Sequence, residues 1–109
     1  MANLNAKEYQ RFEDIKHTTD EGMEFWYARE LSQVLEYTEW RNFNKVIDKA
    51  MLACKNSGFA VSDHFVDINK MVELGSGSQR KIKDYMLSRY ACYLIMQNGD
   101  PRKEVIALG

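Results

Sequence analysis

The sequence predicts an α+β domain that combines a helix-turn-helix-like pair of helices with a basic, wing-like β-hairpin and a central core helix. Apolar residues recur at helical spacing over residues 39–56, at every second position over 65–74, and at helical spacing again over 87–97. The middle segment ends at the Gly-Ser-Gly-Ser sequence of residues 75–78, which is typical of a hairpin tip. With 109 residues, the chain is long enough for one domain, residues 1–109, and too short for two.

The start of the chain predicts one helix and one strand. Residues 4–16 carry a loose apolar stripe, which is typical of a helix that packs on one side. The polar sequence His17–Gly22 favours a turn, because aspartate and glycine suit turn conformations. Residues 23–27 are short and aromatic, which predicts a strand.

Two helices separated by a three-residue turn are predicted next. Residues 28–35 carry apolar side chains on one face, and residues 36–38 break the pattern. Thr38 is placed to cap the helix that starts at Glu39, because its hydroxyl can accept a hydrogen bond from a free backbone N–H group. That helix ends at Asn56-Ser57-Gly58, since glycine is common just after a helix.

A β-hairpin is predicted in the middle of the chain. Residues 65–74 alternate apolar and polar side chains, with Lys70 as the exception. Residues 79–84 predict a weaker return strand, because Ile82 alone is apolar there. The small residues 75–78 join the two strands, so this pairing is a hairpin with a longer loop.

Residues 87–97 predict the central core helix, because they are apolar on most sides and stop at Asn98-Gly99. We expect one face of this helix to pack against one face of helix 39–56, since neither helix is long enough to be stable alone. The side chains that we expect to meet are Trp40, Phe43 and Ile47 from the earlier helix and Tyr90, Leu94 and Ile95 from the later one.

Asp100-Pro101 predicts the start of a further helix, with aspartate at the cap and proline in the first turn. That helix would present Val105, Ile106 and Leu108 but has room for barely two turns before Gly109. We therefore interpret the sequence as the N-terminal fragment of a longer protein, and we expect its apolar end to favour self-association.

Composition and charge exclude several classes of protein. The net charge of -1 shows that the chain as a whole is not a polycation. No apolar run approaches the roughly 18 residues of a membrane span, and the start lacks the apolar core of a signal peptide, so we expect a cytoplasmic protein without a membrane partner. Cys54 and Cys92 fall within apolar helical patterns and are expected to be reduced core residues.

The sequence predicts no catalytic site and no cofactor, so we do not expect an enzyme. His17 and His64 lie far apart, and neither has a metal-ligand partner at a recognisable spacing. The glycines of residues 75–78 lack the following Lys-Ser/Thr of a phosphate loop. Asp63 and Asp67 are expected to be solvated carboxylates rather than a paired acid site.

Cationic and amide side chains gather at the start of the second helix of the pair. In a helix-turn-helix unit this end of the second helix faces the DNA major groove. Arginine and asparagine can bond base edges, while lysine suits phosphate. The alternative is an ordinary solvated helix face. The candidate DNA-binding residues in this part of the chain are Thr38, Arg41, Asn42, Lys45 and Lys49.

The return strand of the hairpin supplies a second group of candidates, Arg80, Lys81 and Lys83, next to the glycine-rich tip. In a winged DNA-binding domain such a hairpin lies along the phosphate backbone or in an adjacent groove. The alternative is an edge hairpin on which lysine only prevents aggregation. The residues alone leave both interpretations open.

Six stretches of the sequence carry a family resemblance: residues 25–31 (FWYAREL), 36–43 (EYTEWRNF), 53–55 (ACK), 64–65 (HF), 88–95 (SRYACYLI) and 97–101 (QNGDP). Together they resemble the Bro-N domain of viral and phage antirepressor-like proteins, in the bacterial branch that is made under DNA damage in the SOS response. The resemblance covers essentially the whole chain. It implies binding to DNA and a link to recombinase filaments on single strands.

Two classes of function follow from the residues and the resemblance. In the first, the chain is a nucleic-acid-binding module of the DNA-damage response that modulates recombinase filaments. In the second, it is a protein-interaction module that binds a DNA-repair protein without contacting DNA. The first class predicts binding that weakens steeply with salt, because bound phosphates release counterions.

Overall fold

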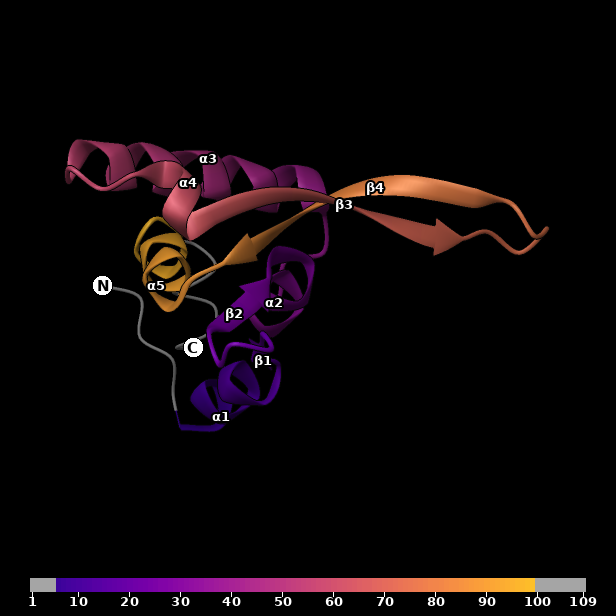
Figure 1. Cartoon of the computed structure of the whole chain (residues 1–109), viewed down its shortest axis with the longest axis horizontal. Coiled ribbons are helices and arrows are strands. Elements are labelled where there is room, and N and C mark those ends of the chain that lie inside the picture. Colours follow the sequence, from indigo (N-terminus) through magenta and orange to yellow (C-terminus); the bar gives the residue numbers. More distant parts are fainter. Residues whose placement is uncertain (1–5, 100–109) are drawn as a thin grey trace.

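The computed structural model describes residues 6–99 and shows an α+β fold, as predicted. The elements are α1 (Ala6–Asp14), β1 (His17–Thr18), β2 (Glu24–Tyr27), α2 (Ala28–Val34), α3 (Trp40–Asn56), α4 (Val61–His64), β3 (Phe65–Glu73), β4 (Gln79–Leu87) and α5 (Arg89–Gln97). The strands form an antiparallel sheet in the order β1-β2-β4-β3. Figure 1 shows α3 and α1 on opposite sides of the body, with the β3–β4 hairpin projecting outward.

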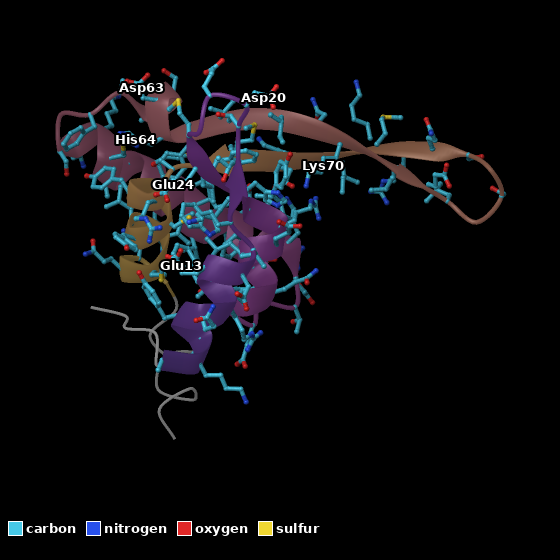
Figure 2. All side chains as sticks on the ribbon, turned by 60° about the horizontal axis from the view of Figure 1, so that its bottom comes forward. Glu13, Asp20, Glu24, Asp63, His64 and Lys70 are labelled. Carbon is cyan, nitrogen blue, oxygen red and sulfur yellow. The ribbon has the colours of Figure 1, made fainter. Side chains whose placement is uncertain are left out.

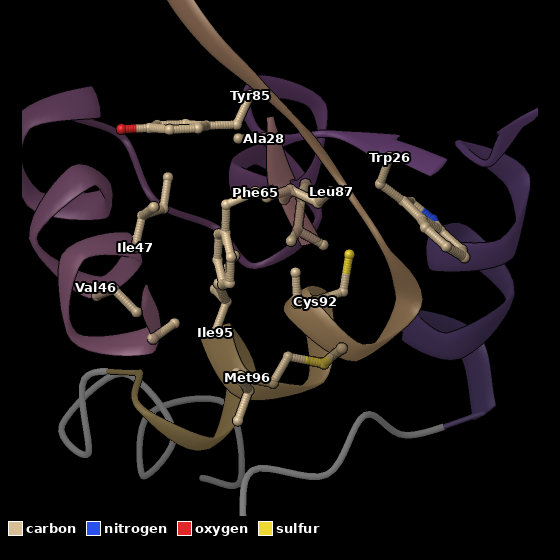
Figure 3. Packing of buried hydrophobic residues seen from close by; sticks show 14 of the residues in the cluster. Trp26, Ala28, Val46, Ile47, Phe65, Tyr85, Leu87, Cys92, Ile95 and Met96 are labelled. Atoms are coloured by element: carbon tan, nitrogen blue, oxygen red, sulfur yellow. The ribbon is translucent and has the colours of Figure 1, made fainter. Parts of the chain in front are cut away.

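The hydrophobic core forms around α5, as the continuous apolar pattern of that helix predicts. Cys92 and Ile95 point toward Phe65 and Leu87 of the sheet in Figure 3, and Met96 is buried in the same cluster. The helix begins later than predicted, because the Ser88 hydroxyl caps it by accepting a hydrogen bond from the Ala91 N–H at 3.0 Å. Leu87 is therefore not the first residue of the helix but the last residue of β4, opposite Phe65.

Helix α3 packs on α5, as predicted. Phe43 and Ile47 are buried on α3, and Leu94 and Ile95 are buried on α5. The two outermost residues of the expected interface, Trp40 and Tyr90, are only partly buried and lie at the rim of the core. The burial of one face of each helix explains why two helices of this length are stable here.

The connection between α2 and α3 differs from the prediction. It spans the five residues 35–39 rather than three, and Glu36 takes a left-handed conformation with φ of 63°. The cap position of α3 is Glu39, whose side chain makes no capping hydrogen bond. Thr38 is therefore not the cap that its hydroxyl suggested, because it lies one residue too early in the chain.

The N-terminal segment also shows a strand that the sequence did not predict. His17 and Thr18 form β1 and pair with Phe25 and Glu24, so the turn is shorter than His17–Gly22. The Thr19 N–H donates to the Met23 carbonyl at 2.9 Å and closes this turn. Helix α1 ends at Asp14, two residues earlier than predicted.

The hairpin is confirmed, and it is longer than predicted. Strand β4 continues from Gln79 to Leu87, where its last residues pair with both Phe65 of β3 and Trp26 of β2. A short helix, α4, precedes β3 and had no signal in the sequence pattern. The helix predicted from Asp100-Pro101, and the apolar end expected to favour self-association, lie outside the described residues. Within residues 6–99, no helix is long and apolar enough to cross a membrane.

Candidate nucleic-acid interface

The first five candidate residues are exposed to solvent: Thr38 in the connection before α3, and Arg41, Asn42, Lys45 and Lys49 on the first ten residues of α3. Arg41, Lys45 and Lys49 follow one another at four-residue spacing along the side of α3 that faces away from the core. The side chain of Arg41 is 82% exposed, and its guanidinium lies 3.9 Å from the Glu39 carboxylate. Such an exposed ion pair contributes little, so Arg41 remains free to bind an anion.

The three cations of β4 are also exposed, but they do not lie on one face of the hairpin. Lys81 pairs across the ladder with Met71, whereas Arg80 pairs with Val72. Because successive strand residues point to opposite faces, Arg80 points away from the face that carries Lys81 and Lys83. The sequence predicted a single basic group on this strand, but the structure divides it between the two faces of the hairpin.

Lys83 lies closer to the body than the other two cations and already has partners. Its ammonium is 3.6 Å from the Asp67 carboxylate and 5.1 Å from the centre of the Tyr85 ring. The pKa of Lys83 is raised, first by the Tyr85 hydroxyl and then by Asp67. Asp67 is thus solvated, as expected, but it also partly neutralises one candidate.

Arg29 of α2 connects the hairpin to the start of α3. Its Nε–H donates to the Lys83 carbonyl at 2.7 Å, and its guanidinium lies 4.2 Å above the Trp40 ring. This side chain contacts the base of the hairpin and the first turn of α3 together. The two groups of candidate residues are therefore held in one fixed arrangement, which the sequence did not reveal.

A buried carboxylate, Asp84 of β4, sits at the centre of this junction. It is fully buried and accepts hydrogen bonds from the backbone N–H of Arg29 at 3.0 Å and of Tyr85 at 2.8 Å. The ammonium of Lys70 lies 2.9 Å from its second oxygen and 3.4 Å from the centre of the Tyr27 ring. Asp84 of β4 therefore caps the start of α2, although it belongs to a different element. We call Asp84, Lys70, Arg29 and Tyr27 the Asp84 cluster.

Arg89, which the sequence places next to the basic hairpin, has a structural role instead. Its guanidinium binds Glu13 of α1 and Glu24 of β2, each at 2.7 Å, and lies 5.0 Å above the Trp26 ring. Figure 2 labels both glutamates on the body of the molecule, away from the projecting hairpin. Hydrogen bonds from Arg89 lower the pKa of both glutamates. Arg89 therefore joins three elements and is not a free cation.

The lowered pKa values of the two glutamates predict an acid-sensitive contribution to stability. Because the folded-state pKa lies below the unfolded one, this contribution is present at neutral pH and is lost as the pH falls below about 4.3. We expect Arg89→Met to cost about 1–2 kcal/mol near pH 7, since the group is partly exposed, and less near pH 3, because the contribution falls as the pH approaches the lowered pKa values of the two glutamates. Urea unfolding between these pH values measures both quantities.

A matched control for this prediction is Arg11→Met, which removes the same kind of side chain from an exposed position on α1. We expect it to change the free energy of unfolding by less than about 0.5 kcal/mol at every pH. Equal losses for Arg89→Met at pH 7 and pH 3 would show that packing on Trp26, rather than the ion pairs, explains the effect.

The histidines and cysteines fall into ordinary structural contacts. His17 contacts Glu30 at 2.7 Å, and the His64 ring contacts the Ser88 hydroxyl at 2.7 Å. Cys54 and Cys92 are buried and unpaired, and burial raises the pKa of both thiols. Asp63 is exposed. Within residues 6–99, no three histidine, cysteine or acidic side chains gather as metal ligands would.

Comparison with known proteins identifies the family of this chain. Residues 14–108 match Bro-N, the N-terminal domain of the BRO family. The chain is 52% identical over 101 residues to DNA damage-inducible protein D of Escherichia coli (strain K12), and the match covers 93% of this chain and 37% of that relative. It thus spans little more than a third of the length of that relative. No solved structure matches the chain. These matches confirm the resemblance found in the sequence, and the chain belongs to the Bro-N family.

Proposed function

We propose that this chain is a nucleic-acid-binding module of a bacterial DNA-damage response, acting in the cytoplasm. The observation that carries the proposal is the fixed arrangement of two exposed cationic groups, one on α3 and one on the hairpin, around the Asp84 cluster. The family and the name of the relative support the same conclusion. In this proposal α2 and α3 act as a helix-turn-helix-like pair, and the hairpin acts as the wing.

The uneven distribution of charge supports DNA as the partner despite the net charge of -1. Between Asn69 and Lys83 the hairpin carries four cations and one acid, Glu73. The outer side of α3 adds Arg41, Lys45 and Lys49, interrupted by Asp48. Local basic surfaces of this kind bind a polyanion even when the whole protein is nearly neutral.

A titration with labelled DNA tests the proposal. We expect binding to random-sequence duplex DNA that weakens steeply between about 50 mM and 200 mM salt. Replacing Arg41 and Lys45 together by glutamine should weaken binding and reduce the slope of log affinity against log salt by about 2, because two phosphate contacts are lost. Fluorescence anisotropy at several salt concentrations measures both values, with single-stranded DNA as a second probe.

The matched control replaces Lys7 and Arg11 by glutamine. Both are exposed on α1, on the side of the body opposite α3, so this variant loses the same charge elsewhere (Figure 1). We expect its affinity and salt slope to stay close to those of the unaltered chain. Equal losses in the two variants would show that net charge, not the α3 surface, governs binding. Absence of binding to either DNA at low salt would overturn the proposal.

The second candidate function is a protein-interaction module whose partner is a DNA-repair protein, such as a recombinase filament on single-stranded DNA. The observation in its favour is exposed apolar surface within the cationic one: Leu52 on α3 and Met71 and Leu74 on the hairpin. A recombinase filament is therefore included as a third probe. Binding to the filament but not to free DNA, with little dependence on salt, would favour this function.

A further inference from the structure

We infer that the hairpin reads base edges in the DNA major groove, through the face that carries Met71. This inference rests on the proposed function and assigns sequence recognition to the hairpin rather than to α3. The Met71 face consists of the cross-strand pairs Asn69 with Lys83, Met71 with Lys81, and Glu73 with Gln79. All six side chains are exposed to solvent.

The shape of the hairpin suits the major groove. Beyond Lys83 the ribbon leaves the body, and Figures 1 and 2 show no other described element beside its outer half. On this face of β4, Tyr85 and Leu87 are buried at the base of the hairpin, whereas the residues farther from the body are exposed. The five residues 79–83 extend about 17 Å at the usual strand rise, and the major groove is about 12 Å wide, 8.5 Å deep and admits a two-stranded ribbon.

The chemistry of the Met71 face also suits base edges. Asn69 and Gln79 carry amides that can bond adenine in pairs, and Lys81 can donate to guanine. Met71, 57% exposed, offers the apolar contact that a thymine methyl group requires. Glu73, the one acid beyond the base of the hairpin, can accept from the amino group of cytosine. Solubility alone would also favour the polar side chains of this face, so the exposed Met71 is the member of the set that points to a partner.

The opposite face of the hairpin is chemically different. It carries the partly buried apolar residues Ile68, Val72 and Ile82. Its cation Lys70 is held by Asp84, so Arg80 is the remaining cation on that face. Apolar β-branched side chains offer no hydrogen bonds to bases, so this face suits the side turned away from the base edges, where Arg80 can contact a phosphate.

Helix α3 is less suited to enter the groove deeply. It lies along the body for its whole length in Figure 1, and only its first turn lies beside the base of the hairpin. Its exposed row also contains Asp48, just before Lys49, and Leu52, one turn after Lys49. We assign Arg41, Lys45 and Lys49 to phosphate contacts that set the orientation of the module, while the hairpin supplies sequence preference.

Selection from a randomised duplex library tests this assignment. We expect the unaltered chain to enrich a preferred sequence, and Asn69→Ala with Gln79→Ala to lose preference at one or more bases by at least about fivefold. Affinity of this variant for random-sequence duplex should change less than about twofold, because its cations remain. Methyl green, which occupies the major groove, should compete with binding, whereas netropsin, which occupies the minor groove, should not.

The comparison variant is Asn42→Ala, which removes an exposed amide from α3. Unchanged base preference in the hairpin variant, with altered preference in Asn42→Ala, would overturn the inference while leaving the proposed function intact. Enrichment of no sequence by the unaltered chain, or displacement by netropsin alone, would overturn it in the same way. Absence of duplex binding at low salt would overturn both the inference and the proposed function.

Discussion

Replacing Leu94 by alanine is expected to lower the free energy of unfolding by about 2–5 kcal/mol. Leu94 is 7% exposed on α5, the helix on which α3 packs, so the residues around it can close only part of the space that the smaller side chain leaves. Alanine favours helix slightly more than leucine, so the loss reflects packing rather than helix formation. Urea unfolding followed by circular dichroism measures the change, with an unaltered dependence on urea as the sign of intact two-state behaviour.

The chain offers a matched control for this substitution, because Leu52 on α3 is 59% exposed. Leu52→Ala removes the same atoms from a helix surface and is expected to change stability by less than about 0.5 kcal/mol. A loss below about 1 kcal/mol for Leu94→Ala would contradict the burial of this side chain. Equal losses for both leucines would show that α3 is covered by another part of the protein.

The elements that could be predicted from the sequence are those whose signal is local. Helix α5 is a continuous apolar segment with a glycine stop, and the hairpin is a change of period around a glycine-rich tip. The end of β4 could not be predicted, because Tyr85–Leu87 is apolar and runs directly into the apolar helix. Only Ser88 marks the boundary, because its hydroxyl accepts a hydrogen bond from the Ala91 N–H, one of the first N–H groups of the helix.

The candidate site was predicted by residue type and could not be predicted in its arrangement. Arg80 and Lys81 lie on opposite faces because successive residues of a strand alternate in direction. This placement can be predicted only if residue 80 is known to belong to the strand. Asp84 bonds the backbone of Arg29, 55 residues earlier, and Arg89 bonds glutamates 65 and 76 residues away. Such pairs leave no mark in local composition, so charges that looked free proved to be structural.

Replacing Asp84 by alanine is expected to cost about 3 kcal/mol of stability. The change leaves two backbone N–H groups, those of Arg29 and the buried Tyr85, without their acceptor, and each unsatisfied buried donor costs about 1–3 kcal/mol. It also removes the counterion of Lys70. The Lys70 side chain is 33% exposed and can turn toward water, so the loss of its counterion lowers the stability less than it would in a fully buried ion pair.

Two further variants separate the parts of this prediction. Asp84→Asn keeps an oxygen for the backbone N–H groups while removing the charge, so we expect it to cost less than Asp84→Ala. Asp67→Ala removes a carboxylate that is 63% exposed on the neighbouring strand and should change stability by less than about 0.5 kcal/mol. Urea unfolding of all three variants gives the comparison. If Asp84→Ala were no more harmful than Asp67→Ala, the Asp84 cluster would not hold the hairpin against α2, and the fixed arrangement of the two cationic groups would need another cause.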